Sequence, residues 1–174
     1  MKFEYRLANT FDVLRLSILL KQVYIHTYGL EGVTDEFANF MTEQFSTENI
    51  LKTIESKEAD LFVATYKENL VGTLKLVYEQ ACPIDNIVAP EVDKLYVLSH
   101  FLGKGIGYHL MQFAEKILLE KGKQELWLAV YSKNDNAIDF YYRQNFKWIG
   151  DTFFQMEENQ YLNKVMYKKL RDES

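Results

Sequence analysis

The sequence is poor in the residues that form cross-links and metal centres. Its 174 residues include one cysteine, Cys82, and three histidines, His26, His100 and His109. A lone cysteine cannot form an internal disulfide bond or a cysteine-based metal cluster. The histidines have no partner at HxxxH or HxxE spacing, so we expect no metal site. Cys82 lies in EQACPIDNIVAP, which we interpret as a loop, and we expect an idle thiol there.

An excess of positive charge and long apolar runs are also missing. The chain has 20 Lys and Arg against 25 Asp and Glu, a formal net charge of -5. A nucleic-acid partner needs clustered basic residues, so this balance argues against one. The N-terminal MKFEYRLANT does not resemble a signal peptide, and no 18 apolar residues run together. We therefore expect a cytoplasmic protein with no membrane partner.

Proline is scarce, with two residues, and no linker or repeat interrupts the chain, so we expect one domain, 1–174. Hydrophobic periodicity predicts the order strand, helices, two strands, strand, helix, strand, helix, two strands. The expected segments are a strand at 2–7, a helix capped by Asn9 or Thr10, helices within 34–57, a hairpin over 61–78, a strand at 91–98, a helix from Gly105 to Gly122, a strand at 125–131, a helix at 135–144 and a hairpin over 146–170. The helix at 135–144 is expected to be capped by Asn134 or Asp135. This order indicates a mixed α+β sheet.

Glycine is not abundant, with eight residues, yet Gly103, Gly105 and Gly107 fall within five positions of SHFLGKGIGYHL. The dinucleotide pattern GxGxxG fails because Tyr108 and Leu110 stand where its third glycine would be, and no GxxxxGK[ST] occurs. A glycine-rich turn from a strand into a helix leaves backbone N–H groups unpaired at the positive end of the helix dipole. The turn therefore suits an anion such as a diphosphate, and a turn without a ligand is the alternative.

The stretch LYVLSHFLGKGIGYHLM, followed about thirty residues later by NDNAIDFYYRQNF, resembles the GNAT acyltransferase superfamily. The first stretch is similar to its pyrophosphate-binding motif, (Gln/Arg)-x-x-Gly-x-Gly/Ala between a strand and a helix, and the second to its N-x-x-A-x-x-x-Y helix. The resemblance implies a mostly antiparallel central sheet with helices on both faces, a splayed central strand pair and acetyl-CoA as cosubstrate. WLAVYSKNDNAIDFYYRQNF is most similar to the PaiA-type spermidine/spermine acetyltransferases.

The resemblance also implies which residues bind the cofactor. The backbone of Leu95, Tyr96 and Val97 would pair with the pantetheine arm, and the glycine turn would hold the pyrophosphate. The turn consists of Leu102, Gly103, Lys104, Gly105, Ile106, Gly107 and Tyr108. Asn134 would contact the cofactor, Tyr141 would lie near its thiol sulfur, and Arg143 would reach its phosphates from the same helix.

Two positions depart from the family pattern. Leu102 stands where the family usually has Gln or Arg, which puts one phosphate contact in doubt. Asn145 replaces the usual glycine before the last hairpin. Asparagine is the next best residue for a left-handed helix stop, so we expect the second change to be tolerated.

Acetyl transfer to an amine needs a base for the amine and a proton for the departing thiolate. Glu91 and Asp93 lie two residues apart on a predicted strand, so their side chains point to one face. Glu91 is eleven residues before Leu102, a spacing at which some family members carry their base. Either carboxylate is a candidate base, and solvated charges at a strand start are the alternative. The resemblance, rather than periodicity, selects Tyr141 over Tyr142 as the proton donor.

The acceptor is the least determined part of the prediction. Residues 31–60 contain eight acidic residues against two lysines, Lys52 and Lys57. The acidic residues are Glu31, Asp35, Glu36, Glu43, Glu48, Glu55, Glu58 and Asp60. They would attract a polycation such as spermidine, and ordinary exposed helix faces are an equal alternative. The aromatics Tyr24, Tyr28, Phe37 and Phe40 would line an alkyl-chain slot or, more simply, pack in the core.

The sequence thus predicts an acetyl-CoA-dependent N-acetyltransferase that acts by direct attack on a primary amine of a small molecule, with a polyamine favoured. Two alternatives stay open: a non-catalytic acyl-CoA-binding or sensing domain, and an acetyltransferase for a peptide or protein amine. A homodimer through the closing hairpin is also left open, because Trp148, Phe153, Phe154 and Tyr161 would give that hairpin an apolar surface.

Overall fold

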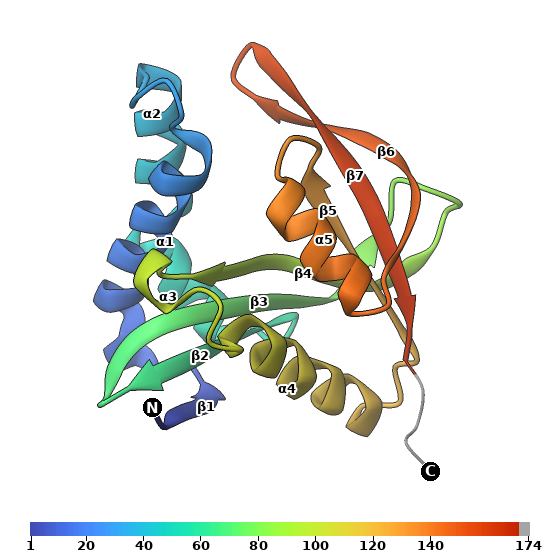
Figure 1. Ribbon diagram of the computed structural model, residues 1–174, viewed down its shortest axis with the longest axis horizontal. Coiled ribbons are helices and arrows are strands. Elements are labelled where there is room, and N and C mark those ends of the chain that lie inside the picture. Colours follow the sequence, from blue (N-terminus) through green and yellow to red (C-terminus); the bar gives the residue numbers. More distant parts are fainter. Residues whose placement is uncertain (171–174) are drawn as a thin grey trace. The chain divides into compact units, whose positions relative to one another are not determined.

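A computed structural model of the chain describes residues 1–170, and its strands form one sheet in the order β1-β2-β3-β4-β5-β7-β6 (Figure 1). The strands are β1 (Phe3–Leu7), β2 (Ala59–Tyr66), β3 (Asn69–Ala81), β4 (Val88–Val97), β5 (Glu125–Tyr131), β6 (Lys147–Met156) and β7 (Asn159–Lys169). β4 and β5 pair in parallel, whereas β1 with β2, β5 with β7 and β6 with β7 pair antiparallel. The predicted mixed, mostly antiparallel sheet is confirmed.

Five α-helices and two short 3-10 turns connect the strands of the described chain. The helices are α1 (Val13–Tyr28), α2 (Asp35–Gln44), α3 (Thr47–Glu55), α4 (Ile106–Glu120) and α5 (Asp135–Arg143). The 3-10 turns are η1 (Thr10–Asp12) and η2 (Ser99–Phe101). The chain forms two compact units, one of 1–75 with 94–114 and one of 76–93 with the described residues from 115 onward.

The core of the first unit lies around β2. Successive side chains of a strand point to opposite faces, and both sets are buried here: Leu61 and Val63 on one face, Phe62 and Ala64 on the other. Phe62 meets Phe113 of α4 edge to face, with ring centroids 5.4 Å apart, and α3 packs against β2. Helices therefore cover both faces of this strand, as predicted.

The second unit has a small core beside the β3–β4 turn. Trp127 of β5 donates its indole N–H to the carbonyl oxygen of Ala89 at 3.2 Å. Cys82, Ala89, Trp127 and Val165 are all buried in one cluster. Burial raises the pKa of the Cys82 thiol, which keeps it protonated and unreactive at neutral pH.

The segment EQACPIDNIVAP is less of a loop than the sequence indicated. β3 continues to Ala81 and β4 begins at Val88, and the N–H of Cys82 donates to the carbonyl of Ile87 at 2.7 Å. Asp85 and Asn86 have φ angles of 58° and 52°, which fits a tight hairpin turn. The predicted loop is too long because the prediction places Pro90 outside the strand. A proline removes a ladder donor and usually marks the end of a strand, but Pro90 lies inside β4.

A buried carboxylate joins β1 to the start of α1. Asn9 caps η1 rather than α1 itself, because α1 begins only at Val13. Within η1, the fully buried Asp12 accepts hydrogen bonds from both terminal nitrogens of Arg6, at 2.6 and 3.0 Å. Asp12 accepts one further hydrogen bond from the guanidinium of Arg15 at 2.6 Å and another from the backbone N–H of Asn9 at 2.9 Å.

The acidity of Asp12 reflects opposing effects. Burial, the largest single effect, disfavours the charged form, but the hydrogen bonds from Arg6 and Asn9 and the charges of both arginines together outweigh it and lower the pKa. A carboxyl whose pKa is lowered by folding stabilises the folded chain above its ordinary pKa near 4. That contribution is lost as the pH falls through the lowered value.

We expect Asp12→Asn to lower the free energy of unfolding by about 1–3 kcal/mol at pH 7, since it leaves the arginine donors without their anion. The difference from wild type should shrink as the pH falls below about 4 and through the lowered pKa of the folded-state carboxyl, because the wild-type side chain then also becomes neutral. Urea unfolding at pH 7 and at a series of lower pH values measures this.

Glu48→Gln is the matched control, because it removes an exposed ion pair with Lys52. It should leave the midpoint nearly unchanged. Equal effects of the two substitutions would contradict the role assigned to Asp12.

Candidate functional site

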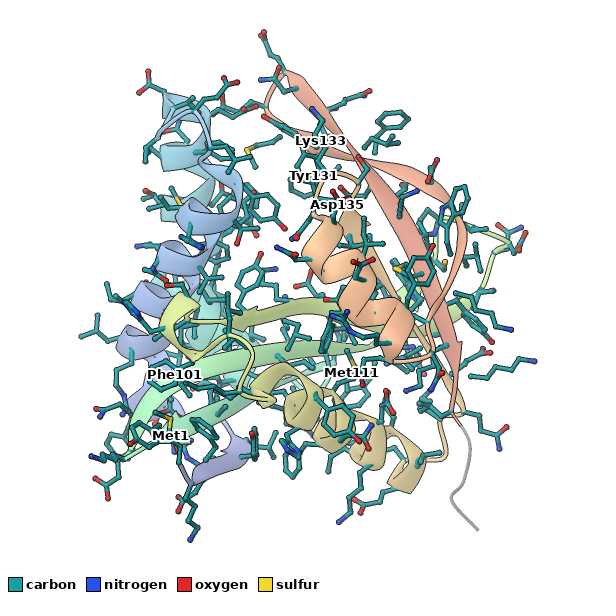
Figure 2. The ribbon with its side chains drawn as sticks, viewed as in Figure 1. Met1, Phe101, Met111, Tyr131, Lys133 and Asp135 are labelled. Atoms are coloured by element: carbon teal, nitrogen blue, oxygen red, sulfur yellow. The ribbon has the colours of Figure 1, made fainter. Side chains whose placement is uncertain are left out.

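The glycine turn lies in the first unit, between β4 and α4. Gly103 and Gly105 have φ angles of 71° and 79°, in the left-handed region that favours glycine, and Gly107 lies within the first turn of α4. The turn begins after η2, whose last residue Phe101 is labelled with Met111 of α4 in Figure 2. The sequence did not predict η2, because Ser-His-Phe carries no strong turn signal.

The start of α4 offers donors to an anion. The N–H of His109 donates to the carbonyl of Gly105 at 3.0 Å, so Gly105 is the residue that caps the helix. The N–H groups of Ile106, Gly107 and Tyr108 therefore have no acceptor one turn earlier within the helix. They lie at the positive end of the helix dipole. This arrangement is suited to binding a phosphate or diphosphate.

The side chains of the turn divide into a buried anchor and an exposed rim. Ile106 is 1% exposed and holds the first helical turn in the core of its unit. Lys104 is exposed, so its ammonium group is accessible to an anion. Leu102 is 59% exposed, and its side chain has no hydrogen-bond donor. It therefore cannot make the phosphate contact expected of the Gln or Arg that the family usually has at this position.

The predicted pantetheine strand also lies in the first unit. Leu95, Tyr96 and Val97 are half-buried in the last part of β4. Just beyond them, the N–H of Leu98 donates to the carbonyl of Val71 at 2.9 Å, which ties this end of β4 to β3.

The two candidate bases lie on β4 in the second unit. Glu91 and Asp93 are half-buried and alternate with the buried Val92, so they share one face of the strand as predicted. Glu91 stands opposite Trp127 of β5 in the parallel ladder. Because β4 begins at Val88, neither carboxylate is at the strand start that the alternative interpretation assumed.

Helix α5 carries the remaining candidates, also in the second unit. Tyr131, Lys133 and Asp135, labelled in Figure 2, mark the connection from β5 into this helix. The side-chain oxygen of Asn134 accepts from the N–H of Ala137 at 3.2 Å, so Asn134 is the helix cap, one of the two caps expected.

Burial separates the two adjacent tyrosines of α5. Tyr141 is 8% exposed and packs edge to face on Phe146, with ring centroids 5.6 Å apart, whereas Tyr142 is 46% exposed. Arg143 is exposed in the last turn, and Asn145 beyond it has a φ of 66°. The prediction that asparagine serves as the left-handed stop is therefore confirmed.

The acidic residues of 31–60 are mostly exposed, and some have local uses. Asp35 and Glu36 lie in the first turn of α2, where a helix dipole favours negative charge. Glu48 pairs with Lys52 at 2.8 Å. Six of the eight are exposed: Glu31, Asp35, Glu43, Glu48, Glu55 and Glu58.

The aromatic residues of α1 and α2 pack against one another. Tyr24 is 7% exposed, and its ring stacks on Phe40 with centroids 5.2 Å apart. It also meets Tyr28 at 4.6 Å and Phe37 at 6.0 Å. This favours core packing over a ligand slot for Tyr24, while the other three rings stay half-buried.

Residues 1–170 contain no helix of the length and apolarity needed to span a membrane. Among the same residues, no group of three or more His, Cys, Asp or Glu side chains is placed to hold a metal ion.

Comparison with known proteins identifies several relatives. The model of the acetyltransferase (GNAT) family matches residues 30–146. The spermidine N(1)-acetyltransferase of Thermoplasma acidophilum is 27% identical over 158 residues, which cover 87% of this chain and 92% of that protein. An uncharacterised N-acetyltransferase in the pepI 3′ region of Lactobacillus delbrueckii subsp. lactis is 22% identical over 162 residues, covering 91% of this chain and 92% of that protein.

Solved structures share the fold. The PaiA N-acetyltransferase of Thermoplasma acidophilum, crystallised in complex with coenzyme A, is 26% identical with a TM-score of 0.80, covering 97% of this chain and 99% of that one. A probable acetyltransferase from Staphylococcus epidermidis has a TM-score of 0.79 at 15% identity, covering 98% and 100%, and supports the fold alone.

The family match covers more than half of the chain, and the relatives span nearly all of it. GNAT acetyltransferases use acetyl-CoA, and the structural relative holds coenzyme A. The chain therefore belongs to the GNAT acetyltransferase family and is an acetyl-CoA-dependent N-acetyltransferase.

Proposed function

We propose that this enzyme acetylates a primary amine of a small molecule by direct attack on acetyl-CoA, with a polyamine as the favoured acceptor. The observation that carries the choice of a cationic acceptor is the acidic excess of residues 31–60, eight carboxylates against two lysines. Such a surface raises the local concentration of a polycation. The 27% identity to a spermidine N(1)-acetyltransferase over 87% of the chain supports the same choice.

Cofactor binding is assigned to backbone groups more than to side chains. In the first unit, the N–H groups of the turn 102–108 would hold the pyrophosphate, with Lys104 adding charge, and the backbone of 95–97 would pair with the pantetheine arm. In the second unit, the amide of Asn134 and the guanidinium of Arg143 would add donors. Each charge-assisted hydrogen bond contributes about 1.5–3 kcal/mol, so four N–H contacts suffice for a diphosphate.

Three proton transfers are assigned to the second unit. An alkylamine with a pKa near 10 must lose a proton before it attacks, at a cost of about 4 kcal/mol at pH 7. Glu91 or Asp93, directly or through water, is the proposed acceptor of that proton. The amine nitrogen then bonds to the thioester carbonyl carbon, the carbon–sulfur bond breaks, and Tyr141 gives its proton to the thiolate. The nitrogen of the new amide loses its second proton, directly or through water, to the Tyr141 oxygen, which restores the hydroxyl. No acyl-enzyme forms, so the buried Cys82 takes no part.

Three further proposals concern the domain organisation, the cellular location and the assembly of the protein. We infer that residues 1–174 act as one domain, because the chain passes between the two units three times. We also propose a cytoplasmic enzyme and a homodimer formed through the β6–β7 hairpin, the long pair at the upper right of Figure 1. Phe153 is 63% and Trp148 50% exposed on that hairpin, which supports the dimer.

We expect spermidine and spermine to give the fastest turnover when acetyl-CoA is offered with polyamines, a lysine peptide and an aminoglycoside, with release of the free thiol followed. Turnover of the polyamines should fall as salt is raised, because salt screens the attraction of an acidic surface.

If the enzyme acetylates only the peptide, its acceptor is a protein amine and not a polyamine. Binding of acetyl-CoA without turnover of any amine would contradict the catalytic assignment of Glu91, Asp93 and Tyr141.

Tyr141→Phe should lower kcat about 100-fold or more, with little change in the Kd for CoA, because it removes the proton donor and keeps the ring. Stopped-flow thiol release and calorimetric titration measure the two quantities. Tyr142→Phe, on the exposed neighbour, is the control and should leave both nearly unchanged. A loss of CoA affinity with kcat retained would make Tyr141 a binding residue instead.

Gly105→Asp should abolish CoA binding by placing a carboxylate beside the proposed pyrophosphate. Gly105→Asn is the matched control: the two side chains have the same shape and tolerate the φ of 79° similarly, but asparagine is neutral. We expect the asparagine variant to retain measurable affinity in a calorimetric titration. If both variants bind CoA equally, the turn does not hold the pyrophosphate.

A further inference from the structure

We propose that Gly72, inside β3, is a positioning residue for cofactor binding: its missing side chain lets β4 and the first turn of α4 approach β3 at one point. The inference rests on the proposed function, because it takes 95–97 and 102–108 as the residues that hold CoA. Gly72 and the neighbours that carry the argument all belong to the first unit.

The space around Gly72 is filled from two elements. A Cβ on this residue would lie 3.1 Å from Cγ2 of Ile106 and 3.4 Å from Cδ1 of Leu110, both on α4. It would lie 3.2 Å from the carbonyl oxygen of Tyr96 on β4. Ordinary carbon contacts are about 3.5–4.0 Å, so the smallest side chain would crowd Ile106 and the Tyr96 oxygen and would leave no spare room beside Leu110.

Backbone conformation does not explain the glycine. Gly72 is absent from the positive-φ residues of the described chain, whereas Gly103 and Gly105 are among them. Glycine also weakens a strand interior, because it adds flexibility and packs no side chain. A glycine kept inside a strand without a positive φ marks a close approach of neighbouring atoms, which is what the distances show.

The crowded neighbours have little freedom to move aside. Ile106 is 1% and Leu110 0% exposed, so α4 is enclosed where it faces β3. The Tyr96 contact is a main-chain oxygen, and the hydrogen bond from Leu98 to Val71 holds β4 to β3 close by. An added methyl group would therefore shift the start of α4 or the backbone of β4 by a few tenths of an ångström.

Such a shift acts on the proposed cofactor contacts. Ile106 carries one of the first N–H groups of α4, and Tyr96 is the middle residue of the proposed pantetheine strand. Hydrogen bonds weaken steeply when their distance and angle change, and a small displacement of a positioned group can cost a large factor in binding or rate. Gly72 itself does not contact the ligand. It acts through β4 and the first turn of α4, whose positions it determines.

The test compares Gly72→Ala with Gly150→Ala. An added Cβ at Gly150, on β6 in the second unit, would lie 2.7 Å from Cδ1 of Ile84, so this control also crowds a strand but lies outside the cofactor residues. Calorimetric titration with CoA, thermal melting, and kcat with KM are measured for both. We expect Gly72→Ala to raise the Kd and KM for CoA about tenfold or more. Gly150→Ala should lower the melting temperature and leave both constants unchanged.

A compensating substitution separates positioning from general damage. Ile106→Leu removes the Cγ2 methyl group nearest to Gly72 at nearly constant volume. The double variant Gly72→Ala with Ile106→Leu should therefore recover most of the lost CoA affinity. A loss of stability alone would not produce this recovery in Kd.

If Gly72→Ala does not fold, Ile106→Ala and Leu118→Ala replace it, because both truncate fully buried residues of α4 at opposite ends. Only the first should weaken CoA binding. A folded Gly72→Ala variant with wild-type Kd, or equal effects of the two truncations, would overturn the inference. Absence of CoA binding in the wild-type protein would instead refute the proposed function itself.

Discussion

The passage of the chain from β4 into α4 depends on a backbone conformation that most residues avoid. Gly103 and Gly105 both adopt the left-handed region, which costs other L-residues about 1–2 kcal/mol each. This turn sets where α4 begins, because Gly105 supplies the first helical acceptor. The start of α4 in turn determines that Ile106 is buried and that three N–H groups remain at the helix end. The cofactor binding proposed for this turn therefore relies on main-chain geometry more than on a charged side chain.

Asparagine and glycine shape the candidate functional elements of both units. In the second unit, Asn134 caps α5 and Asn145 ends it in a left-handed conformation, so the helix has little freedom in length. Its fixed ends determine that Tyr141 is buried against Phe146 while Tyr142 is exposed. In the first unit, Gly72 supplies space and Gly105 supplies conformation. The two glycines show that the same residue type meets two different physical demands.

Much of the fold was predictable because its elements carry strong local signals. The strand at 125–131 was predicted with the bounds that β5 has, since a continuous apolar run is typical of a strand buried on both faces. Asn134 and Asn145 were recognised by their cap chemistry. The errors fall where local signals mislead: Pro90 suggested a loop but lies inside β4, and Ser99–Phe101 form a 3-10 turn without a recognisable signature.

The sequence by itself determined the order of elements, because hydrophobic periodicity is a property of neighbouring residues. Its resemblance to the GNAT family, carried by two short motifs, indicated the family and the cosubstrate. Tertiary structure alone decided which of two adjacent tyrosines is enclosed, that Asp12 joins Arg6 and Arg15, and that Gly72 faces both Tyr96 and α4. These facts depend on the packing of segments that are distant in the chain or turned by a helix. Burial and close contact arise only when those segments meet, so no local pattern encodes them.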